Sequence, residues 1–448
     1  MPWRAWARKA HPARKIAGNS SVPEPTTPLI ERPWEDVERM LDVDAALQHV
    51  LSAFAPLEPV SVPLLDAATM VLAADVIARD DVPPFRNSAM DGYAVRAADT
   101  TSATWSAPAQ LPVAAYVAAG QGDVPRLRAG EAIRIMTGAP LPDGADAVVR
   151  FEETDESGSA GQSERETVLV YRAARLLDNV REAGEDIARG TLVVRRGQVL
   201  RAADLGLIAS IGQPSVHVHR RPVVAVLSTG NEVLEPGEQL KPGTIRDSNS
   251  FVIGALARSW GADVRLIGIA RDTVADLTGR LAEAENVDLI VTSGGVSLGD
   301  YDLVKDVLES EGEIAIWQVR MKPGKPLAFG HIGMTPLLGL PGNPVAAAVS
   351  FIIFGRPAIR KMLGHAATEP RMAEVVTADG IDNRGHRRHY VRVRLEPVEG
   401  GPLLARIAGE QGAGVLSSLA AADALMIVPE ELERVQAGTC LWAILLDW

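Results

Sequence analysis

The sequence predicts a multidomain protein: a central α/β domain with a largely parallel sheet, β-rich N-terminal subdomains and a small C-terminal β domain. Three observations predict this fold class. The 448 residues suffice for about two to four domains. Strand-like and helix-like segments alternate after Pro222, as in parallel sheets with helical crossovers. Before and after that part, short apolar runs are separated by many of the 40 glycines and 30 prolines, as in small β domains.

The composition narrows the class of protein. Hydrophobic residues make up 47% of the chain, and no apolar run approaches the length of a membrane span, so we expect a cytoplasmic protein without membrane insertion. The net charge of −12 argues against nucleic acid as a partner, because phosphate contacts need a basic face. Cys440 is the single cysteine, which excludes an internal disulfide, and its apolar neighbours predict a core position.

The first part of the chain is predicted to hold a tail and an N-terminal region. Residues 1–33 are rich in Lys and Arg, lack the apolar segment of a signal peptide, and are predicted to be a disordered basic tail. A basic docking arm is the alternative. Residues 34–218 are predicted to form two subdomains, one mixed α/β and one β-rich, with helices at 43–54 and 202–211.

Three loops of this N-terminal region carry polar side chains. Asp91 follows Ser88 in a loop that could present both side chains to a ligand. The alternative is that Asp91-Gly92 only forms a tight hairpin turn. Thr137 precedes Gly138 in a hydroxyl-glycine loop, and Asp186 lies in a turn bounded by glycines.

Residues 219–366 are predicted to form the α/β domain. Strands are expected at 223–227, 263–267, 289–292, 315–319 and 337–340, and helices at 249–260, 276–284, 302–308 and 345–354. Ligands of such domains bind beyond the carboxyl ends of the strands. The residues after the five strand ends are the candidate site residues: Ser228, Thr229, Gly230 and Glu232; Asp272; Ser293, Gly294, Gly295, Ser297 and Asp302; Lys322 and Lys325; Pro341, Gly342 and Asn343.

These loops indicate a site for an anion and a metal. Paired glycines let backbone N–H groups approach an oxyanion closely, and the carboxylates of Asp300 and Asp302 beside them suggest bound Mg²⁺. The alternative is that Ser293 and Asp302 only cap a turn and a helix. Neither GxGxxG nor GxxxxGK[ST] occurs, which weakens the dehydrogenase and P-loop interpretations.

Residues 367–448 are predicted to form the small C-terminal β domain. Residues 384–394 alternate with period two, so His389 and Arg392 should lie on opposite faces of a strand. The alternative is an edge strand protected by charge. The glycine-rich residues 409–419 are expected to close over an anion.

Seven motifs occur in order between about Val43 and Val428: NSAMDGYAV, RIMTGAPLPDGADAVV, GED, STGNE, SGGVSLGDYD, MKPGKP and LPGNPV. Together they closely resemble the molybdopterin molybdenumtransferase family, the bacterial relatives of the gephyrin E domain. The resemblance implies a homodimer of elongated four-domain subunits with the active site at the subunit interface. It also implies Mg²⁺-dependent insertion of molybdate into adenylylated molybdopterin, supplied by molybdopterin adenylyltransferase, with release of AMP.

The resemblance implies a role for each candidate residue. Glu232, Asp272 and Asp302 would hold Mg²⁺ and the substrate, and the loop from Ser293 to Ser297 would cradle phosphate. Lys322, Lys325 and Arg392 would bind molybdate, while Asp91 and Thr137 would reach the partner subunit's cleft. Four positions depart from the family pattern: Asn231, Gln318, Ala346 and Ala413. The resemblance implies serines at positions 346 and 413, so two hydroxyl groups near molybdate are lost. We therefore expect an active enzyme with a weakened molybdate site.

Two alternatives from other classes stay open. A gephyrin-like dimeric scaffold would bind a cytoskeletal or membrane partner, but it has no need for Lys322, Lys325, Asp302 or Glu232. The related adenylyltransferase step usually belongs to a compact single-domain protein, so the flanking domains argue against it.

Overall fold

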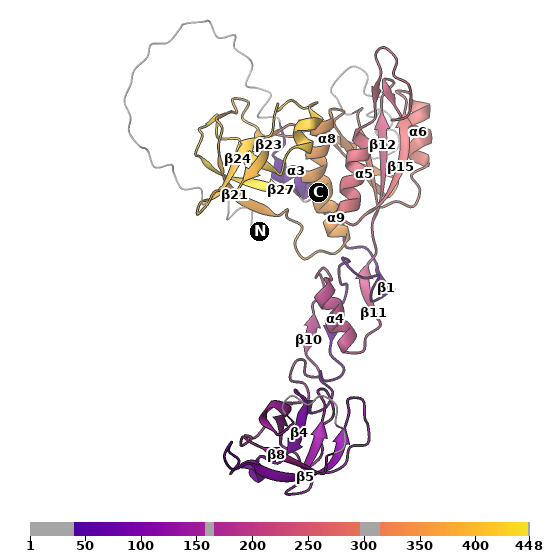
Figure 1. Ribbon diagram of the computed structural model, residues 1–448. Helices are drawn as coiled ribbons and strands as arrows, with labels where there is room; N and C mark the ends of the chain where they lie inside the picture. The colour runs from indigo at the N-terminus through magenta and orange to yellow at the C-terminus, as the bar shows by residue number, and fades with distance from the viewer. Residues whose placement is uncertain (1–39, 157–164, 296–313, 447–448) are drawn as a thin grey trace, which may run out of the picture. The chain divides into compact units, whose positions relative to one another are not determined.

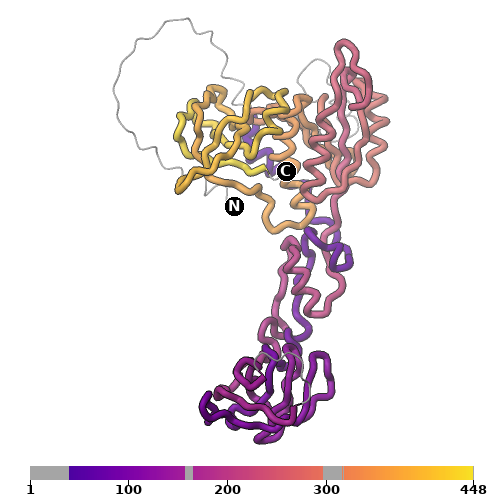
Figure 2. The backbone as a smooth tube through the Cα atoms, viewed as in Figure 1, coloured from indigo at the N-terminus to yellow at the C-terminus, as the bar shows by residue number. Residues whose placement is uncertain are grey.

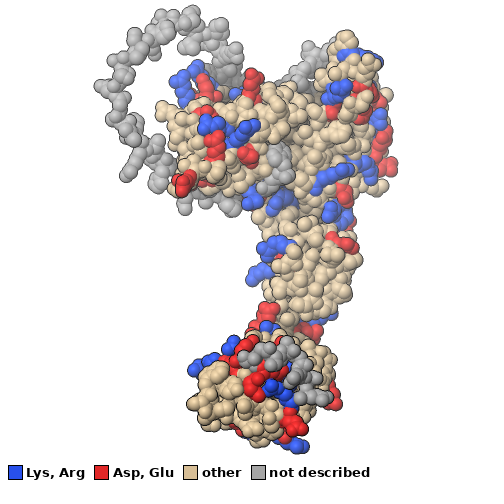
Figure 3. Space-filling model, in the orientation of Figure 1, with Lys and Arg blue, Asp and Glu red and all other residues tan. Residues whose placement is uncertain are grey.

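The computed structural model describes residues 40–156, 165–295 and 314–446 (Figure 1). The predicted tail at 1–33 and the predicted helix at 302–308 lie outside these ranges. Within them, no helix has both the length and the apolar character that a membrane crossing requires. On the face drawn in Figure 3, acidic and basic side chains are intermixed.

A six-stranded sheet forms the centre of the α/β part, in the order β15-β12-β16-β20-β19-β17. The strands β12 (Val223–Thr229), β15 (Asp263–Ala270), β16 (Leu289–Ser293) and β20 (Thr335–Leu340) pair in parallel, which confirms the largely parallel sheet. β19 (Pro326–Ile332) runs antiparallel between β20 and β17 (Ile314–Gln318). β19 was not predicted, because it begins at a proline shortly after Pro323-Gly324.

Helices cover both faces of this sheet (Figure 1). Val224 and Val226 of β12 pack in one core with α5 (Asn249–Ser259), while Ala225 and Leu227 pack in another with α6 (Val274–Ala282). This alternation is the period of a strand that is buried on both faces.

The last helical segment of the α/β part is longer than predicted. α8 (Pro344–Ser350) continues through a π-helical turn, η4 (Phe351–Gly355), into α9 (Arg356–Met362). The predicted end at 354 is therefore wrong. Pro357 lies in the first turn of α9, where a missing N–H costs little, so it does not end the helical segment.

The C-terminal part is a closed β-barrel. Five strands pair in a ring: β23 (Arg388–Glu396), β24 (Leu403–Ile407), β21 (Met372–Thr377), β27 (Cys440–Leu445) and β25 (Ala424–Val428). β18 (Met321–Lys322) adds to β23 in parallel. Because β23 has partners on both sides, the edge-strand alternative is wrong. Cys440 is exposed at the start of β27, so its predicted core position is wrong too.

The N-terminal region begins with α3 (Val43–Ser52), which packs in the core of the α/β part, and continues as two groups of strands. β1 (Pro59–Pro63) and β11 (Ser215–His219), far apart in sequence, lie side by side (Figure 2), and α4 (Ala202–Ser210) packs in the same core. The second group is a five-stranded sheet with the order β7-β4-β6-β5-β8. Its strands are β4 (Gly92–Val95), β5 (Ala109–Val117), β6 (Ala132–Ile135), β7 (Ala147–Arg150) and β8 (Thr167–Val170).

Asp91-Gly92 does not form the hairpin that was the alternative. β3 (Asn87–Ser88) pairs with β9 (Val180–Arg181), whereas β4 pairs with β6 and β7. Gly92 is required by packing instead, because a Cβ at this position would overlap the carbonyl oxygen of Val149.

Candidate functional site

The loops at the carboxyl ends of the parallel strands meet at one edge of the central sheet. The Gly230 N–H after β12 donates to the Ala270 carbonyl oxygen of β15 at 3.1 Å, and the Gly294 N–H after β16 donates to the Leu340 carbonyl oxygen of β20 at 3.1 Å. Four of the five predicted loops are therefore brought together, as the sheet topology requires.

Three glycines lie where these loops meet, and we call Gly230, Gly294 and Gly342 the glycine cradle. Gly294 has φ +95°, and a Cβ there would lie 2.7 Å from Thr229 Oγ1 and 2.8 Å from the Thr229 carbonyl oxygen. A Cβ on Gly342 would lie 3.7 Å from the Cα of Gly294. Gly295 follows with φ +67°. Only glycine fits the contact at 294, so the loops present backbone rather than side chains to a ligand.

Asn249, at the start of α5, joins two of these loops and was missed by the sequence analysis. Its Nδ2 donates to Ser293 Oγ at 2.7 Å and to the Gly342 carbonyl oxygen at 2.8 Å, while Ser293 Oγ donates to the Pro341 carbonyl oxygen at 3.3 Å. The only signal for it was an Asp-Ser-Asn run before a helix, which is typical of an ordinary N-cap.

Ser228 and Asn343 support the helices beside this edge. Ser228 is 2% exposed, and its Oγ bonds to Asp247 Oδ1 and Ser250 Oγ, both at 2.9 Å, which fixes the start of α5. Asn343 is the N-cap residue of α8, and its carbonyl oxygen accepts the Ala347 N–H at 2.9 Å. Their predicted roles in substrate binding stay predictions.

The carboxylates of the predicted metal site lie on two adjacent loops. Asp272 follows β15, and its Oδ2 accepts the Asn231 N–H at 3.0 Å. The Glu232 carboxylate folds toward Gly230, where a Cβ would lie 2.7 Å from Oε2. Within residues 40–156, 165–295 and 314–446, no group of three or more His, Cys, Asp or Glu side chains is arranged to hold a metal. The third predicted ligand, Asp302, lies outside the described residues, as does Ser297.

The side chains of these two loops carry the type of ligand atom that a hard cation prefers. Glu232, Asp272 and Asn231 offer only oxygen atoms, the donor type that Mg²⁺ prefers, and all three side chains are exposed.

A second group of predicted residues lies where β18 joins the barrel. The register of β18 and β23 places Lys322 opposite His389. Burial is the main cause that lowers the pKa of Lys322, and the charges of Arg387 and Arg392 lower it further. We call Lys322, Arg387, His389 and Arg392 the basic cluster. Lys325 lies in the same turn, half-buried, and its carbonyl oxygen accepts the Val319 N–H at 2.7 Å.

Arg392 holds the glycine-rich segment that was expected to close over an anion. Its guanidinium donates to Ser418 Oγ from Nε at 2.9 Å, and from Nη2 to the carbonyl oxygens of Glu410 at 2.9 Å and Gly412 at 3.2 Å. Burial lowers the pKa of this fully buried group. The segment is therefore ordered by Arg392.

Two of the four expected departures from the family pattern, Ala346 and Ala413, lie near this segment. The Ala413 carbonyl oxygen accepts the Val345 N–H of α8 at 3.0 Å. The Ala346 carbonyl oxygen lies 3.5 Å from the place of a Cβ on Gly324, in the turn between Lys322 and Lys325. Both alanines thus lie where α8, this turn and the glycine-rich segment meet. Gln318 ends β17, and its carbonyl oxygen accepts the Leu41 N–H at 2.7 Å.

Asp91 and Thr137 contact each other beside the five-stranded sheet. Asp91 Oδ1 accepts the N–H and the Oγ1 hydroxyl of Thr137, both at 2.7 Å, and these two bonds lower the pKa of Asp91. Asp186 is exposed in the turn after Gly184.

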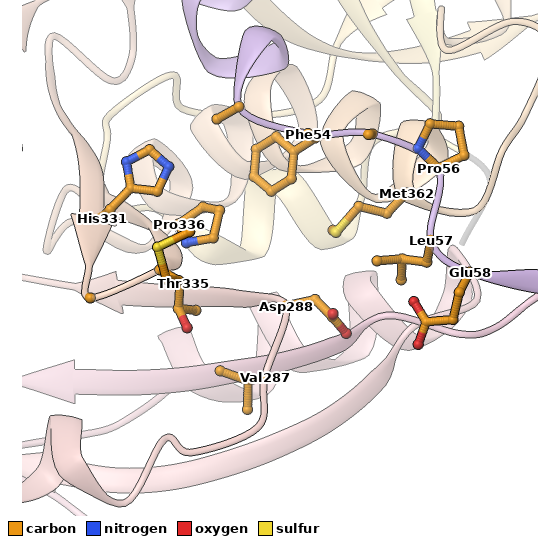
Figure 4. Close-up of a pocket in the computed structure, with 14 residues that line it drawn as sticks. Phe54, Pro56, Leu57, Glu58, Val287, Asp288, His331, Thr335, Pro336 and Met362 are labelled. Carbon is orange, nitrogen blue, oxygen red and sulfur yellow. The ribbon is translucent and has the colours of Figure 1, made fainter.

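The cavity drawn in Figure 4, of about 620 Å³, lies at the other end of the sheet, before β16 and at the start of β20. Phe54, Leu57 and Met362 line it together with Asp288 and Thr335. The Asp288 carboxylate is already bound by Arg220 through two bonds of 2.7 Å. This cavity is therefore not part of the predicted site.

A parallel sheet with glycine loops at the carboxyl ends of its strands is typical of domains that bind phosphate-bearing ligands. Three family models match the chain: the MoeA N-terminal region (domain I and II) over residues 41–212, the probable molybdopterin binding domain over 225–361, and the MoeA C-terminal region (domain IV) over 374–446. The chain therefore belongs to the MoeA family.

Individual relatives agree with this assignment. Molybdopterin molybdenumtransferase 2 of Mycobacterium tuberculosis is 41% identical over 391 residues, which cover 86% of this chain and 94% of that relative. The molybdopterin molybdenumtransferase of Haemophilus influenzae is 34% identical, with 89% and 97% covered. The crystal structure of the molybdopterin biosynthesis MoeA protein from Pyrococcus horikoshii matches with a TM-score of 0.78 at 32% identity, covering 91% of this chain and 100% of that chain. The predicted family and fold class are confirmed.

Proposed function

We propose that this protein is a molybdopterin molybdenumtransferase, which inserts molybdate into adenylylated molybdopterin and releases AMP. The observation that carries the proposal is the contact of three glycine loops at the carboxyl ends of β12, β16 and β20. The Gly230 and Gly294 N–H groups hold these loops together, and the backbone N–H groups next to them would suit the pyrophosphate of the substrate. The name shared by the M. tuberculosis and H. influenzae relatives supports the same reaction.

The residues divide the chemistry between two groups. The glycine loops, positioned by Ser293 and Asn249, would hold the pyrophosphate through backbone N–H groups, and Lys322, Lys325 and Arg392 would bind the molybdate dianion. A molybdate oxygen would attack the adenylate phosphorus and break the phosphoanhydride bond, which gives phosphorylated molybdopterin and an adenylyl-molybdate. The Mo–O bond to the attacking oxygen would then break, so that AMP leaves with this oxygen while molybdenum bonds to the molybdopterin sulfurs. The lysine and arginine charges stabilise the negative charge that gathers as two anions meet.

Mg²⁺ would be held by Glu232, Asp272 and Asp302, with the Asn231 carbonyl as a neutral oxygen donor. The oxygen-only chemistry of the described donors supports this assignment. When bound, the ion would neutralise phosphate charge at the reacting centre. Removal of Mg²⁺ with a chelator is expected to abolish AMP release, and its return should restore it.

The homodimer and its setting belong to the same proposal. Large apolar side chains are exposed in the N-terminal region, including Leu65 at 81% and Leu176 at 68%, which supports a subunit interface there. Asp91, Thr137 and Asp186 would reach the partner's cleft. Molybdopterin adenylyltransferase would supply the substrate, and we place the protein in the cytoplasm.

Mixed dimers test the shared site. Asp91→Ala and Asp272→Asn are each expected to be inactive. If a site draws on both subunits, a mixture of the two variants should regain part of the activity, because some mixed dimers hold one complete site. Light scattering that reports a monomer, or a mixture that stays inactive after subunit exchange, would contradict the shared site.

A single-turnover assay tests the reaction itself. Wild-type protein, adenylylated molybdopterin, Mg²⁺ and molybdate should give molybdate-dependent AMP release, which Asp272→Asn should lose. Asp263→Asn is the matched control, because Asp263 is exposed at the opposite end of β15. A folded wild type that releases no AMP would instead favour the scaffold alternative.

A further inference from the structure

His389 is buried in the basic cluster with two polar atoms that lack partners. The residue is 4% exposed, and neither Nδ1 nor Nε2 has a hydrogen-bond partner among the described residues. Its backbone position on β23 lies opposite Lys322 of β18. Because an unpartnered buried polar group is costly, a ring with both nitrogens open indicates a ligand or water at this place.

The charge around His389 is positive. Burial and the charges of Lys322, Arg392 and Arg387 lower its pKa to about 3. The imidazole is therefore neutral at neutral pH, with one N–H donor and one acceptor nitrogen. Asp382, the carboxylate that acts on Lys322, is paired with Arg384 at 3.0 Å. The cluster thus keeps an excess of positive charge, which suits a dianion.

Arg392 adds a second open donor to the cluster. Its Nε and Nη2 are used within the barrel, but its Nη1 is buried and has no partner among the described residues. His389 shares its face of the β18–β23 pair with Lys322, whereas Arg392 lies on the opposite face of β23, from which it adds positive charge to the cluster.

We propose that His389 binds the molybdate substrate, donating its ring N–H to one molybdate oxygen while Lys322 and Arg392 neutralise the charge. The inference rests on the proposed function, since molybdate is its substrate. His389 supplies a directional donor in a site where Ala346 and Ala413 stand in place of hydroxyl residues. Its other nitrogen is left to accept a hydrogen bond.

Three variants test this role. His389→Leu removes the N–H donor and replaces the ring with an apolar side chain of similar size. His389→Gln keeps a donor and an acceptor. His217→Leu is the matched control, because His217 is exposed on β11 in another sheet. Titration calorimetry with molybdate should show His389→Leu binding about tenfold or more weakly, since a lost hydrogen bond to a charged group has this effect. His389→Gln should recover most of the affinity, and His217→Leu should equal the wild type.

Two further readouts separate a binding role from a structural one. The affinity of His389→Leu for adenylylated molybdopterin should match that of the wild type. If His389→Leu does not fold, the wild type itself decides: molybdate should shift the ring resonances of His389 in NMR spectra, assigned by comparison with His389→Gln. Unshifted resonances at saturating molybdate would overturn the inference.

The outcomes distinguish this inference from the proposed function. If the wild type releases AMP with molybdate but His389→Leu has unchanged molybdate affinity, the inference is overturned and the function stands. If molybdate binds through His389 but no AMP is released, the function fails and the inference stands. A wild type that binds no molybdate overturns both.

Discussion

Asn231 and Asp272 exchange a pair of hydrogen bonds between the loops after β12 and β15. The Asn231 N–H donates to Asp272 Oδ2 at 3.0 Å, and the Asp272 N–H donates to Asn231 Oδ1 at 3.2 Å. Each side chain therefore holds the other residue's backbone. The pair holds the two loops together, and Asn231 adds no negative charge to those of Asp272 and Glu232, whereas the resemblance to the family implies an aspartate at position 231.

The first prediction is that Asn231→Asp tightens the binding of Mg²⁺. A carboxylate at 231 can still accept the Asp272 N–H, but it adds a charge that attracts the cation and repels Asp272 in its absence. We expect half-maximal AMP release at a several-fold lower Mg²⁺ concentration. Without Mg²⁺ the variant should unfold more easily, by up to about 1 kcal/mol. Asn286→Asp, at an exposed position outside the site, should leave both quantities unchanged.

The periodicity of the sequence was sufficient to predict the four parallel strands of the central sheet and the edge where their following loops lie. Val224 and Val226 face one core and Ala225 and Leu227 the other, so β12 appears in the sequence as a continuous apolar run. Such runs identify buried parallel strands, and parallel strands place their following loops at one edge. The sequence alone was therefore sufficient to assign the glycines and carboxylates at the strand ends to one edge of the sheet.

The basic cluster could not be predicted as a group, because it depends on long-range pairing. Lys322 faces His389 only because β18 leaves the central sheet region and adds to the barrel strand β23. No local pattern specifies that pairing. Asn249 was missed for a related reason: its bonds to Ser293 and Gly342 join segments that are close only in the folded chain.

The second prediction concerns Gly294→Ala. The positive φ and the overlap with Thr229 should together lower the free energy of unfolding by about 2–4 kcal/mol. Substrate binding should be lost as well, because the loop must move away from the cradle. Gly243→Ala is the control for backbone strain alone, since Gly243 has φ +80° and open space around a Cβ. That variant should lose only about 1–2 kcal/mol in urea unfolding and keep substrate binding.

The third prediction concerns pH and the bond between Asp91 and Thr137. Thr137→Val removes the hydroxyl donor, so the pKa of Asp91 should rise toward its ordinary range, as NMR titration of the carboxyl carbon can measure. A lowered pKa stabilises the folded state above the ordinary carboxylate pKa, and that stabilisation is lost as the pH falls through the folded-state pKa. The wild type should therefore exceed Thr137→Val in stability at neutral pH, with the difference vanishing in acid. Thr137→Ser should behave as the wild type, and a difference that grew in acid would contradict this account.

The fourth prediction concerns the buried ion pair of Arg134 and Glu156 in the N-terminal region. Arg134 Nη2 lies 2.7 Å from Glu156 Oε1, the two side chains are 8% and 1% exposed, and the Tyr93 hydroxyl donates to Glu156 Oε2 at 2.6 Å. Glu156→Gln keeps the size of the side chain but leaves the buried guanidinium charge uncompensated. We expect the free energy of unfolding to fall by about 3–5 kcal/mol in denaturant titrations. Glu152→Gln, the same change at an exposed position, should have little effect, and equal losses for both variants would show that the buried pair is not the cause.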